Sequence, residues 1–598
     1  MTVKVDKFAP HPVKEQFPGV EFCVNSNPPW AEAVILAFQH YLVMLGTIVL
    51  ISSIVVPAMG GGNVEKAYMI QTMLFVAAMN TLLQTWFGTR LPVVIGGSFR
   101  FIVPMLYIAL QNRYSIYLDP ATRFRHTMRG IQGALMMSSI LPILLGFLGI
   151  WRIVVRFLSP LSAVPLVTLV GFGLYAQGFP LYMPYWYKSK WVDRFAVLIS
   201  IAIVWAYASL LTAAGAYKTK PPNTQFSCRV DRSGLISGAS WIKFPYPFQW
   251  GQPTLRAGDT FVMLAAAFVS LVESTGTFIA AARYGSATHV PSSVLSRGAA
   301  WLGIGILMDG MWGTGTGSTA SVENVGLLAV TKVGSRRVVQ MSAGFMFFFS
   351  ILGKFGAIVA SIPLPIIGAL YCVLFAYMSS AGLGLLQYCN LNSYRTKFIL
   401  GFSIFMGLSV PQYFNGYVVT TGQGPFNELM LVIFTSPATV AGIVSMFLDR
   451  TLGYGDKDIR IDGGRHWWGK FKYYERDARS AEFYSLPYGL SNYESGDVLA
   501  DEEKAKAIAI DEINKSPEQN NRRLTVATIR YLFHVISFLL MLQSLCSKQN
   551  PKRNAAKNNR SIFTVGSTDH LSAGVNGGAR LMLSLLDIAR TFSASAGA

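Results

Sequence analysis

The sequence predicts an all-α protein that crosses a membrane many times, and three observations support this prediction. Of the 598 residues, 52% are hydrophobic and only 13% are charged, about half the charged fraction of a soluble domain. The mean hydropathy is +0.40, and apolar stretches of the roughly 20 residues needed to span a bilayer recur along most of the chain. Two of these stretches are interrupted in a similar way by glycines and polar residues.

Thirteen apolar stretches follow one another between the two ends of the chain. The first thirty residues are polar and Pro-rich and contain no apolar signal segment, so we expect a cytosolic arm and a first span that targets the protein. We predict spans near residues 33–57, 67–88, 91–110, 128–150, 160–179, 192–213, 259–282, 296–312, 316–332, 338–359, 363–385, 396–411 and 427–447.

The basic net charge is first of all an indication of membrane topology, and only then of possible binding partners. The formal net charge is +20, and in membrane proteins Lys and Arg accumulate in cytoplasmic loops. No basic tract is interleaved with aromatic residues, so nucleic acid is not an expected partner. The five cysteines form neither a CxxC pair nor a Cys/His cluster, and no nucleophile–base pair is visible. The sequence therefore predicts no metal site, no cofactor and no enzymatic activity.

The two interrupted stretches are where we expect a ligand site. The segment Gly313–Lys332 reads GTGTGSTASVENVGLLAVTK, and the segment Leu91–Pro104 reads LPVVIGGSFRFIVP. Interrupted segments at matching places in two halves of a carrier point to a midplane site built on inverted repeats. Two plainer explanations stay open, namely glycines that allow close helix packing and, for Gly313–Lys332, an extramembrane loop.

Carboxylates within the apolar stretches are the first candidate ligand groups. Glu273 lies in the motif LVESTGTF, with Thr277 one helical turn later, and Glu323 lies in the second interrupted stretch. An ionisable residue at membrane depth is a functional-site hypothesis by default. Burial favours a neutral carboxyl group and a nearby cation favours a charged one, so one of a close pair could bind a proton and release it on the other side. Two such acceptors could also recognise N–H groups on a nucleobase edge.

Other polar and aromatic residues allow either a functional or a structural interpretation. Gln39 offers donors and an acceptor that suit the edge of a planar heterocycle, while His40 is equally well explained as a structural hydrogen-bond partner. Phe99 could stack on a flat ligand or simply pack. Arg100 could extend to the membrane surface or pair with a carboxylate, and Asp309 could lie at a re-entrant interface.

Several motifs resemble the nucleobase–ascorbate transporter family, and the resemblance covers about residues 10–490. ENVGLLAVTK (Glu323–Lys332) matches the family signature Gln/Glu/Pro-Asn-x-Gly-x4-Thr-Arg/Lys. The Gln-His pair of the family's first span is present as Gln39 and His40. The family's glutamate is present as Glu273, in the motif ESTGTF. The stretches FQHYLVMLGT, PYPFQWG and VGSRRVVQ resemble the plant branch.

The resemblance implies a fold and a set of site residues. The fold would have fourteen spans in two inverted repeats of seven, with a core domain that carries the substrate against a dimerising gate domain in an elevator-like movement. The substrate-binding residues would be Glu273, Glu323, Ser98, Phe99, Gln39 and Asn324. The residues expected to support the site or couple its movement are His40, Thr277, Asp309, Gly326, Thr331 and Lys332.

The resemblance also implies a domain organisation for this chain. The expected parts are a cytosolic arm (1–32), the first part of the core domain (33–158), a shortened first part of the gate domain (159–213), a polar loop between the repeats (214–258), the second part of the core domain (259–361, with its broken span at 316–332), the second part of the gate domain (362–447) and a polar, mostly disordered tail (448–598).

The chain departs from the family pattern in several places. About thirteen of fourteen spans are found, because after residue 179 the chain runs into YWYKSKWVDRFAVL where a further gate span is expected. An odd number of spans would invert every later span and remove the pairing of the two broken stretches, unless another segment re-enters the membrane. Thr277 stands where many members are acidic, and Arg100 where a small or polar residue is expected. The tail after FYSLPYGL is also atypical, which suggests a splice variant or a gene-model error.

The leading functional hypothesis is proton-coupled symport of nucleobases such as xanthine, uric acid, uracil, adenine or guanine. We expect a homodimer in the lipid bilayer of the plasma membrane, with a cytoplasmic N-terminus. Glu323 favours nucleobases, because ascorbate carriers of the family have Pro at that position. Two alternatives remain: a non-transporting variant that pairs with intact subunits, and an ascorbate or other anion carrier on the same fold.

Overall fold

A computed structural model describes residues 19–174, 190–221, 224–225, 228–230, 239–354, 357, 362–416, 424–452, 462–468 and 478–487. All of them belong to one compact unit, residues 1–542, and the second unit, Gln543–Ala598, lies outside the described residues. Most of the predicted arm, the stretch 175–189 beside the expected missing span, and the predicted tail beyond residue 487 also lie outside them.

Helices make up almost all of the described elements, which confirms the predicted all-α membrane fold. In the first half of the chain they are α1 (Trp30–Ala58), α2 (Asn63–Trp86), η2 (Phe99–Phe101), α3 (Ile102–Ala109), α4 (Asn112–Ser115), α5 (Pro120–Ser138), α6 (Ile140–Phe147), α7 (Ile150–Arg156), α8 (Pro160–Phe172) and α9 (Lys190–Ala213). In the second half they are α12 (Ala257–Tyr284), α13 (Ser292–Trp312), α14 (Val322–Thr331), α15 (Arg336–Ile351), α17 (Leu364–Gly384), η4 (Leu385–Tyr388), α18 (Tyr394–Gly416), α19 (Gly424–Phe434), α20 (Pro437–Thr451), α22 (Arg465–Trp468) and α23 (Ala478–Tyr484).

Within the described residues, five helices are long and apolar enough to cross a membrane. They are α1, the continuous run of α5 and α6, α12, α17 with η4, and α18. Two bent helix pairs, α7 with α8 and α19 with α20, raise the number to seven if each pair is one span. The remaining predicted spans correspond to helices that are shorter, broken or more polar.

The predicted span 427–447 is not one continuous helix. The axes of α19 and α20 differ by 78°, because Pro437 has no N–H to continue the helical ladder and forces the preceding residue out of the helical region. Ser436 is accordingly extended, with φ −88° and ψ 107°. A proline at the first position of α8, Pro160, accompanies the 107° bend between α7 and α8.

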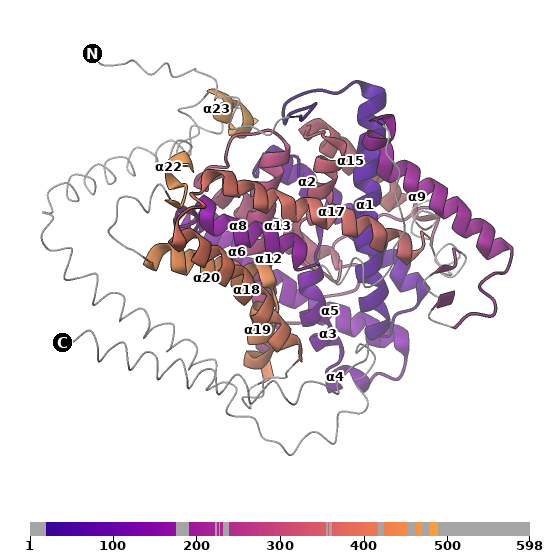
Figure 1. Ribbon diagram of the computed structural model, residues 1–598. Coiled ribbons are helices and arrows are strands. Elements are labelled where there is room, and N and C mark those ends of the chain that lie inside the picture. The colour runs from indigo at the N-terminus through magenta and orange to yellow at the C-terminus, as the bar shows by residue number, and fades with distance from the viewer. Residues whose placement is uncertain are drawn as a thin grey trace, which may run out of the picture. The chain divides into compact units, whose positions relative to one another are not determined.

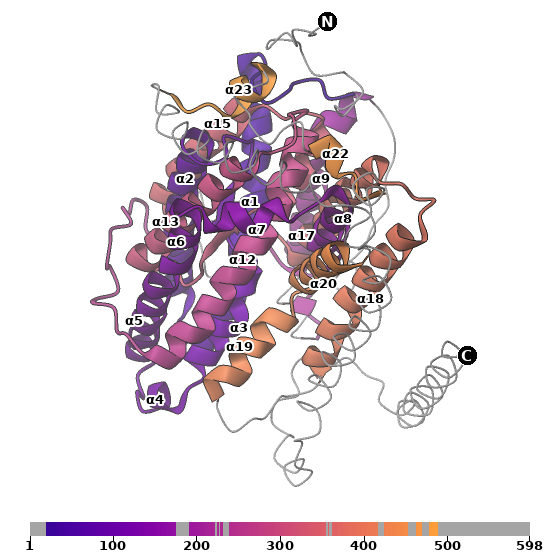
Figure 2. The ribbon, with the colours of Figure 1, turned by 90° about the vertical axis from the view of Figure 1, so that its left-hand side faces the viewer.

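The helices pack in two groups. In one, α1, α2 and α15 lie against each other (Figure 1), and α12 packs on α5. In the other, α8 contacts α17, α18 and α20 (Figure 2). These groups resemble the expected core and gate domains, although that division stays a prediction. On the second group, α18 exposes Phe398, Phe405 and Leu408, as expected for side chains that face lipid.

The two interrupted stretches pair with each other. Strand β1 (Ile95–Gly97) runs antiparallel to β2 (Ser318–Ala320), with Ile95 opposite Ala320. Ser98 N–H donates to Gly317 O at 3.1 Å, and Ser321 N–H donates to Val94 O at 2.9 Å. The pairing that an odd number of spans was expected to remove is therefore present. It satisfies backbone groups that lipid could not.

Two glycines permit the close packing around this sheet. A Cβ at Gly96 in β1 would lie 2.2 Å from Cε of Met44 in α1. A Cβ at Gly326 in α14 would lie 2.3 Å from the carbonyl oxygen of Leu374 in α17. A backbone atom cannot move away as a side chain can, so Gly326 sets how closely α14 approaches α17.

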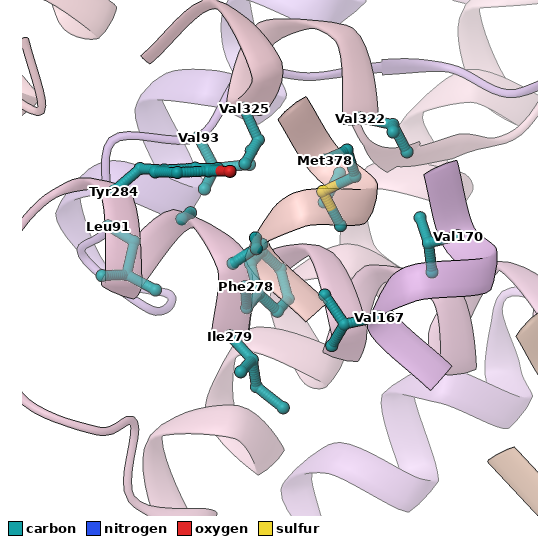
Figure 3. Close-up of a cluster of buried hydrophobic side chains, with 14 of the residues drawn as sticks. Leu91, Val93, Val167, Val170, Phe278, Ile279, Tyr284, Val322, Val325 and Met378 are labelled. Carbon is teal, nitrogen blue, oxygen red and sulfur yellow. The ribbon is translucent and has the colours of Figure 1, made fainter. Parts of the chain in front are cut away.

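Hydrophobic side chains enclose the second broken stretch. Figure 3 shows α14 contributing to a buried cluster with α12, α8 and α17 through Val322, Val325, Phe278, Ile279, Val167, Val170 and Met378. A second buried cluster joins α1, α2, α3 and α5. Phe99 packs against both clusters, so the first broken stretch lies where they meet.

Replacing Gly326 by Ala should destabilise the fold. The added methyl group would push α14 away from α17, and overpacking of this kind costs about 1–3 kcal/mol. Thermal unfolding of the purified protein in detergent would measure the change. Gly344→Ala is the matched control, because Gly344 lies in α15 with no atom within 4 Å of an added Cβ. An equal or smaller loss for Gly326→Ala than for Gly344→Ala would contradict the close-packing argument.

Candidate functional site

Each broken stretch has the order strand, serine, helix. Ser98 follows β1 and accepts a hydrogen bond from Arg100 N–H at 3.2 Å. Ser321 follows β2 and accepts one from Asn324 N–H at 3.2 Å. Serine at the N-cap satisfies a free N–H of the first turn, and the positive end of each helix dipole lies at that serine. Counted from its serine, Arg100 and Glu323 occupy the same position in the two stretches.

Glu323 is buried among hydroxyl groups. Ser321 Oγ donates to its Oε2 at 2.8 Å, and the Thr47 hydroxyl of α1 lies near the carboxyl group. Thr47 in turn lies 2.7 Å from the hydroxyl of Tyr371 in α17. Within the described part of the chain, no Lys or Arg forms an ion pair with Glu323. Its position at a helix N-terminus compensates part of the charge.

Asn324 links α14 to α1. His40 Nδ1 donates to Asn324 Oδ1 at 2.9 Å, and Asn324 Nδ2 donates to Ser321 Oγ at 2.9 Å. His40 and the adjacent Gln39 are buried in α1. Of the predicted residues Gln39, His40 and Asn324, the structure brings His40 and Asn324 together, and His40 acts there as a hydrogen-bond partner of another protein side chain.

Glu273 is paired with a cation. Arg100 Nε lies 2.6 Å from Glu273 Oε1, and Ser436 Oγ donates to the same oxygen at 2.9 Å. These three residues come from η2, from the middle of α12 and from the bend between α19 and α20. Of the two roles considered for Arg100, the structure therefore has the ion pair with a carboxylate.

Polar side chains from α2 and α12 hold the two strands. Thr81 Oγ1 accepts from Ile95 N–H at 3.0 Å, and Asn80 Nδ2 donates to Ser318 Oγ at 3.0 Å. Ser274, the neighbour of Glu273, accepts from Ala320 N–H at 3.1 Å through Oγ. Because Ser274 bonds to β2, the position of Glu273 along α12 is tied to the sheet.

Asp309 at the end of α13 supports the second broken stretch through hydrogen bonds. Ser318 Oγ donates to its Oδ2 at 2.5 Å, and Thr314 Oγ1 lies 3.2 Å from its Oδ1. The carboxyl group is buried at the end of α13. It therefore holds the loop that precedes β2 and does not lie at an exposed interface.

Three predicted residues lie apart from the carboxyl groups. The Thr277 hydroxyl donates to the backbone carbonyl of Glu273 at 2.9 Å and not to its carboxylate. The Thr331 hydroxyl donates to Leu327 O at 2.8 Å. Lys332 is exposed at the other end of α14 from Glu323, where its φ of 58° ends the helix. These residues shape the helices that carry the site.

Four residues of the site were not predicted from the sequence: Thr47, Ser321, Tyr371 and Ser436. Thr47 could have been found, because it follows His40 by two helical turns on the same face of the first span. Ser436 could have been suspected from the Ser-Pro dipeptide, which marks a probable break within a predicted span. Tyr371 has no such signal, since a tyrosine in an apolar stretch is usually a packing residue.

The arrangement combines hydrogen-bond acceptors and donors in a buried space. Two carboxyl groups, one guanidinium and several hydroxyls surround the start of two broken helices. Such groups can bind and orient a polar planar ligand by its edge, with Phe99 available to contact a flat face.

The sequence matches known proteins over most of its length. The Permease family matches residues 31–190 and 181–416. Nucleobase-ascorbate transporter 4 of Arabidopsis thaliana is 59% identical over 522 residues, which cover 82% of this chain and 99% of that protein. Nucleobase-ascorbate transporter LPE1 of Zea mays is 55% identical over 82% of this chain and 99% of its own length. The chain belongs to the nucleobase–ascorbate transporter family.

Membership of this family confirms the resemblance read from the motifs, including the plant relatives. It also bears on the missing span. Because 82% of 598 residues is about 490 residues, about thirty of the 522 aligned positions have no counterpart in this chain. That total is comparable to one span of roughly 20 residues with its connections, and the missing span stays a prediction.

Solved structures are less similar to this transporter-family chain. The transmembrane domain of a cyanobacterium bicarbonate transporter, BicA, is 14% identical with a TM-score of 0.34, and the match covers 72% of this chain and 99% of that domain. This likeness is too low to bear on the fold, which rests on the contacts described above.

Replacing Ser321 by Ala should destabilise the second broken stretch. The change removes the N-cap of α14 and the donor to Glu323, and loss of a serine cap typically costs about 1 kcal/mol. Thermal unfolding in detergent would measure it. Ser321→Thr keeps the hydroxyl and should stay close to the parent; equal losses for Ala and Thr would show that the hydroxyl contributes nothing.

Proposed function

We propose that the protein is a secondary active transporter that moves nucleobases together with protons. Xanthine, uric acid, uracil, adenine and guanine are the candidate substrates. The single observation that carries this proposal is the buried Glu323 carboxyl group at the N-terminus of α14, held by hydroxyl groups and without a cationic partner within the described residues. We further propose the plasma membrane as its location, a cytoplasmic N-terminus and a homodimer.

The two carboxyl groups suit different tasks. Arg100 neutralises the charge of Glu273, so protonation of Glu273 would leave the guanidinium unpaired in a buried site. Glu323 accepts from the Ser321 hydroxyl and has no cationic partner within the described residues, and a hydroxyl can donate to a carboxylate or accept from a neutral carboxyl group. We therefore assign proton coupling to Glu323, and substrate N–H recognition to both residues.

Substrate binding would also affect the contact between the two helix groups. Ser436 at the bend between α19 and α20 donates to the same Glu273 oxygen that contacts Arg100. A substrate N–H that binds Oε1 of Glu273 must compete with Ser436. This competition supports the proposal that substrate loosens the contact between a mobile core domain and the gate domain, as an elevator-like movement requires.

A second candidate function is a subunit that does not transport by itself. The aligned positions that this chain lacks favour it, because they amount to about one span. Such a chain would keep the site and pair with intact subunits. A third candidate, an ascorbate or other anion carrier, is less well supported. The side chain of Glu323 repels an anion unless this carboxyl group is protonated.

Uptake measurements separate these functions. Cells without their own carriers would express the full chain and receive labelled xanthine, uracil, adenine or ascorbate at acidic and neutral external pH, with surface expression measured in parallel. We expect saturable nucleobase uptake that acid stimulates. Uptake of ascorbate alone would identify an anion carrier. Surface expression without uptake, restored by inserting the corresponding span of a relative, would identify the non-transporting variant.

The role of Glu323 can be tested with two substitutions. Glu323→Ala should abolish uptake without loss of surface expression, because no acceptor remains. Glu323→Gln should bind substrate but lose acid stimulation, because an amide does not titrate. Rates at several external pH values would show the difference.

Glu65→Gln is the matched control for this experiment. Glu65 also lies in the first turn of a helix, where its carboxylate accepts from Gly62 N–H at 2.9 Å, and Gln can keep that contact. It should leave the pH profile unchanged. Normal acid-stimulated uptake by Glu323→Gln would remove Glu323 from the coupling step.

A further inference from the structure

Arg100 occupies a position that disfavours a cation. It lies in the first turn after the Ser98 cap, where the helix dipole is positive and favours anions. Glu323 stands at the corresponding position of the other broken stretch, where its charge suits the dipole. A half-buried arginine at a helix N-terminus therefore needs compensation, and Glu273 supplies it.

Glu273 does not use the whole guanidinium. The contact at 2.6 Å involves Arg100 Nε. Both Nε and Nη2 are buried and make no hydrogen bond among the described residues, so Nε meets Glu273 as an ion pair and Nη2 has no close acidic partner. Leaving a buried donor unpaired is costly, yet the side chain as a whole retains 16% exposure. An unused donor beside a candidate substrate-binding carboxylate is what a ligand contact requires.

We propose that Arg100 contacts the substrate and determines specificity, with Nη2 donating to a carbonyl oxygen, so that oxo-nucleobases are preferred over adenine. This inference rests on the proposed transport of nucleobases and names the substrate class within it. The adjacent Glu273 carboxylate accepts from the ring N–H next to that carbonyl.

The chemistry of the pair explains the preference. A guanidinium carries donors only and a carboxylate carries acceptors only. A lactam edge places a carbonyl acceptor beside an N–H donor and can satisfy both in one orientation. Adenine has an amino donor where hypoxanthine has the carbonyl, so in that orientation it turns a donor toward Nη2. A site built to hydrogen-bond one group strongly rejects an analogue that lacks it.

Hypoxanthine and adenine make the sharpest pair of test ligands, because they differ only at this edge. Each would be added to the purified full chain in detergent, and the dissociation constant would be measured from the ligand-induced rise in unfolding temperature. Uptake of the same two bases would be measured in cells. We expect the parent to bind hypoxanthine at least about tenfold more tightly than adenine.

Arg100→Gln should bring this ratio close to one, because Gln offers both a donor and an acceptor. The double variant Arg100→Gln with Glu273→Gln provides a second test, since it leaves no unpaired buried charge if the single variant fails to fold. It should also lose the preference. A ratio that stays at the parent value in a folded Arg100 variant would overturn the proposal.

Arg113→Gln is the matched control. Arg113 of α4 pairs with Asp259, which lies on α12 as Glu273 does. The side-chain exposures of this pair, 20% and 5%, are close to the 16% and 6% of Arg100 and Glu273. Breaking this pair should lower stability but leave the hypoxanthine-to-adenine ratio unchanged. An equal change of ratio for Arg113→Gln would show that the effect is a general loss of packing.

The failure of the proposal and the failure of the proposed function give different results. If the parent binds nucleobases but its hypoxanthine-to-adenine ratio does not depend on Arg100, only the specificity assignment is wrong. If the parent binds and transports no nucleobase at all, both are wrong.

Discussion

The pairing of β1 with β2 is the interaction on which the rest of the site depends. A chain that breaks its helices within a membrane exposes N–H and C=O groups that lipid cannot satisfy. Here the backbone groups of each broken stretch hydrogen-bond to those of the other. Side chains of α2 and α12 add further hydrogen bonds to the strands, through Thr81, Asn80 and Ser274. The two helix N-termini that begin at Ser98 and Ser321 are thereby held close to Glu273 and Glu323.

Once the strands are paired, the environment of each carboxyl group decides what it can do. Glu273 lies beside a guanidinium, whereas Glu323 accepts a hydrogen bond from a hydroxyl and has no ion-pair partner among the described residues. Placing two carboxyl groups in unequal environments is a general way to give them different roles. Arg100 creates the difference in this chain, and it stands where the family pattern leads one to expect a small or polar residue.

The second helix group reaches the site at the bend before α20 and through Tyr371 of α17. Ser436 caps α20 and also donates to Glu273, so a residue of the α19–α20 pair contacts the α12 carboxylate directly. The positions that this chain lacks relative to its relatives are thus compatible with an intact site, because the contacts of Glu273 and Glu323 come from α1, η2, α12, α14, α17 and the α19–α20 bend. Whether the assembly transports depends on the movement between the groups.

Much of the fold and part of the site could be predicted from the sequence because local patterns report local properties. Apolar stretches indicate helices in lipid, and the glycines and hydroxyls of Gly313–Lys332 indicate a break. Glu273 and Glu323 stand out as ionisable residues against an apolar background, so the sequence marked them as candidate site residues. The bend at Ser436 was missed as a site contact, since a Ser-Pro dipeptide signals a break but not what the break touches.

The sequence by itself determined the membrane class, the two broken stretches, the candidate carboxyl groups and the family. The tertiary structure alone decided that Arg100 pairs with Glu273, that Thr47 and Tyr371 lie near Glu323, and that Ser436 contacts the site. These contacts join residues that are far apart in the chain, and each of them depends on how helices from both halves pack. Hydropathy and short motifs report the neighbours of a residue along the chain, whereas its partners in space follow only from the packing of the whole fold.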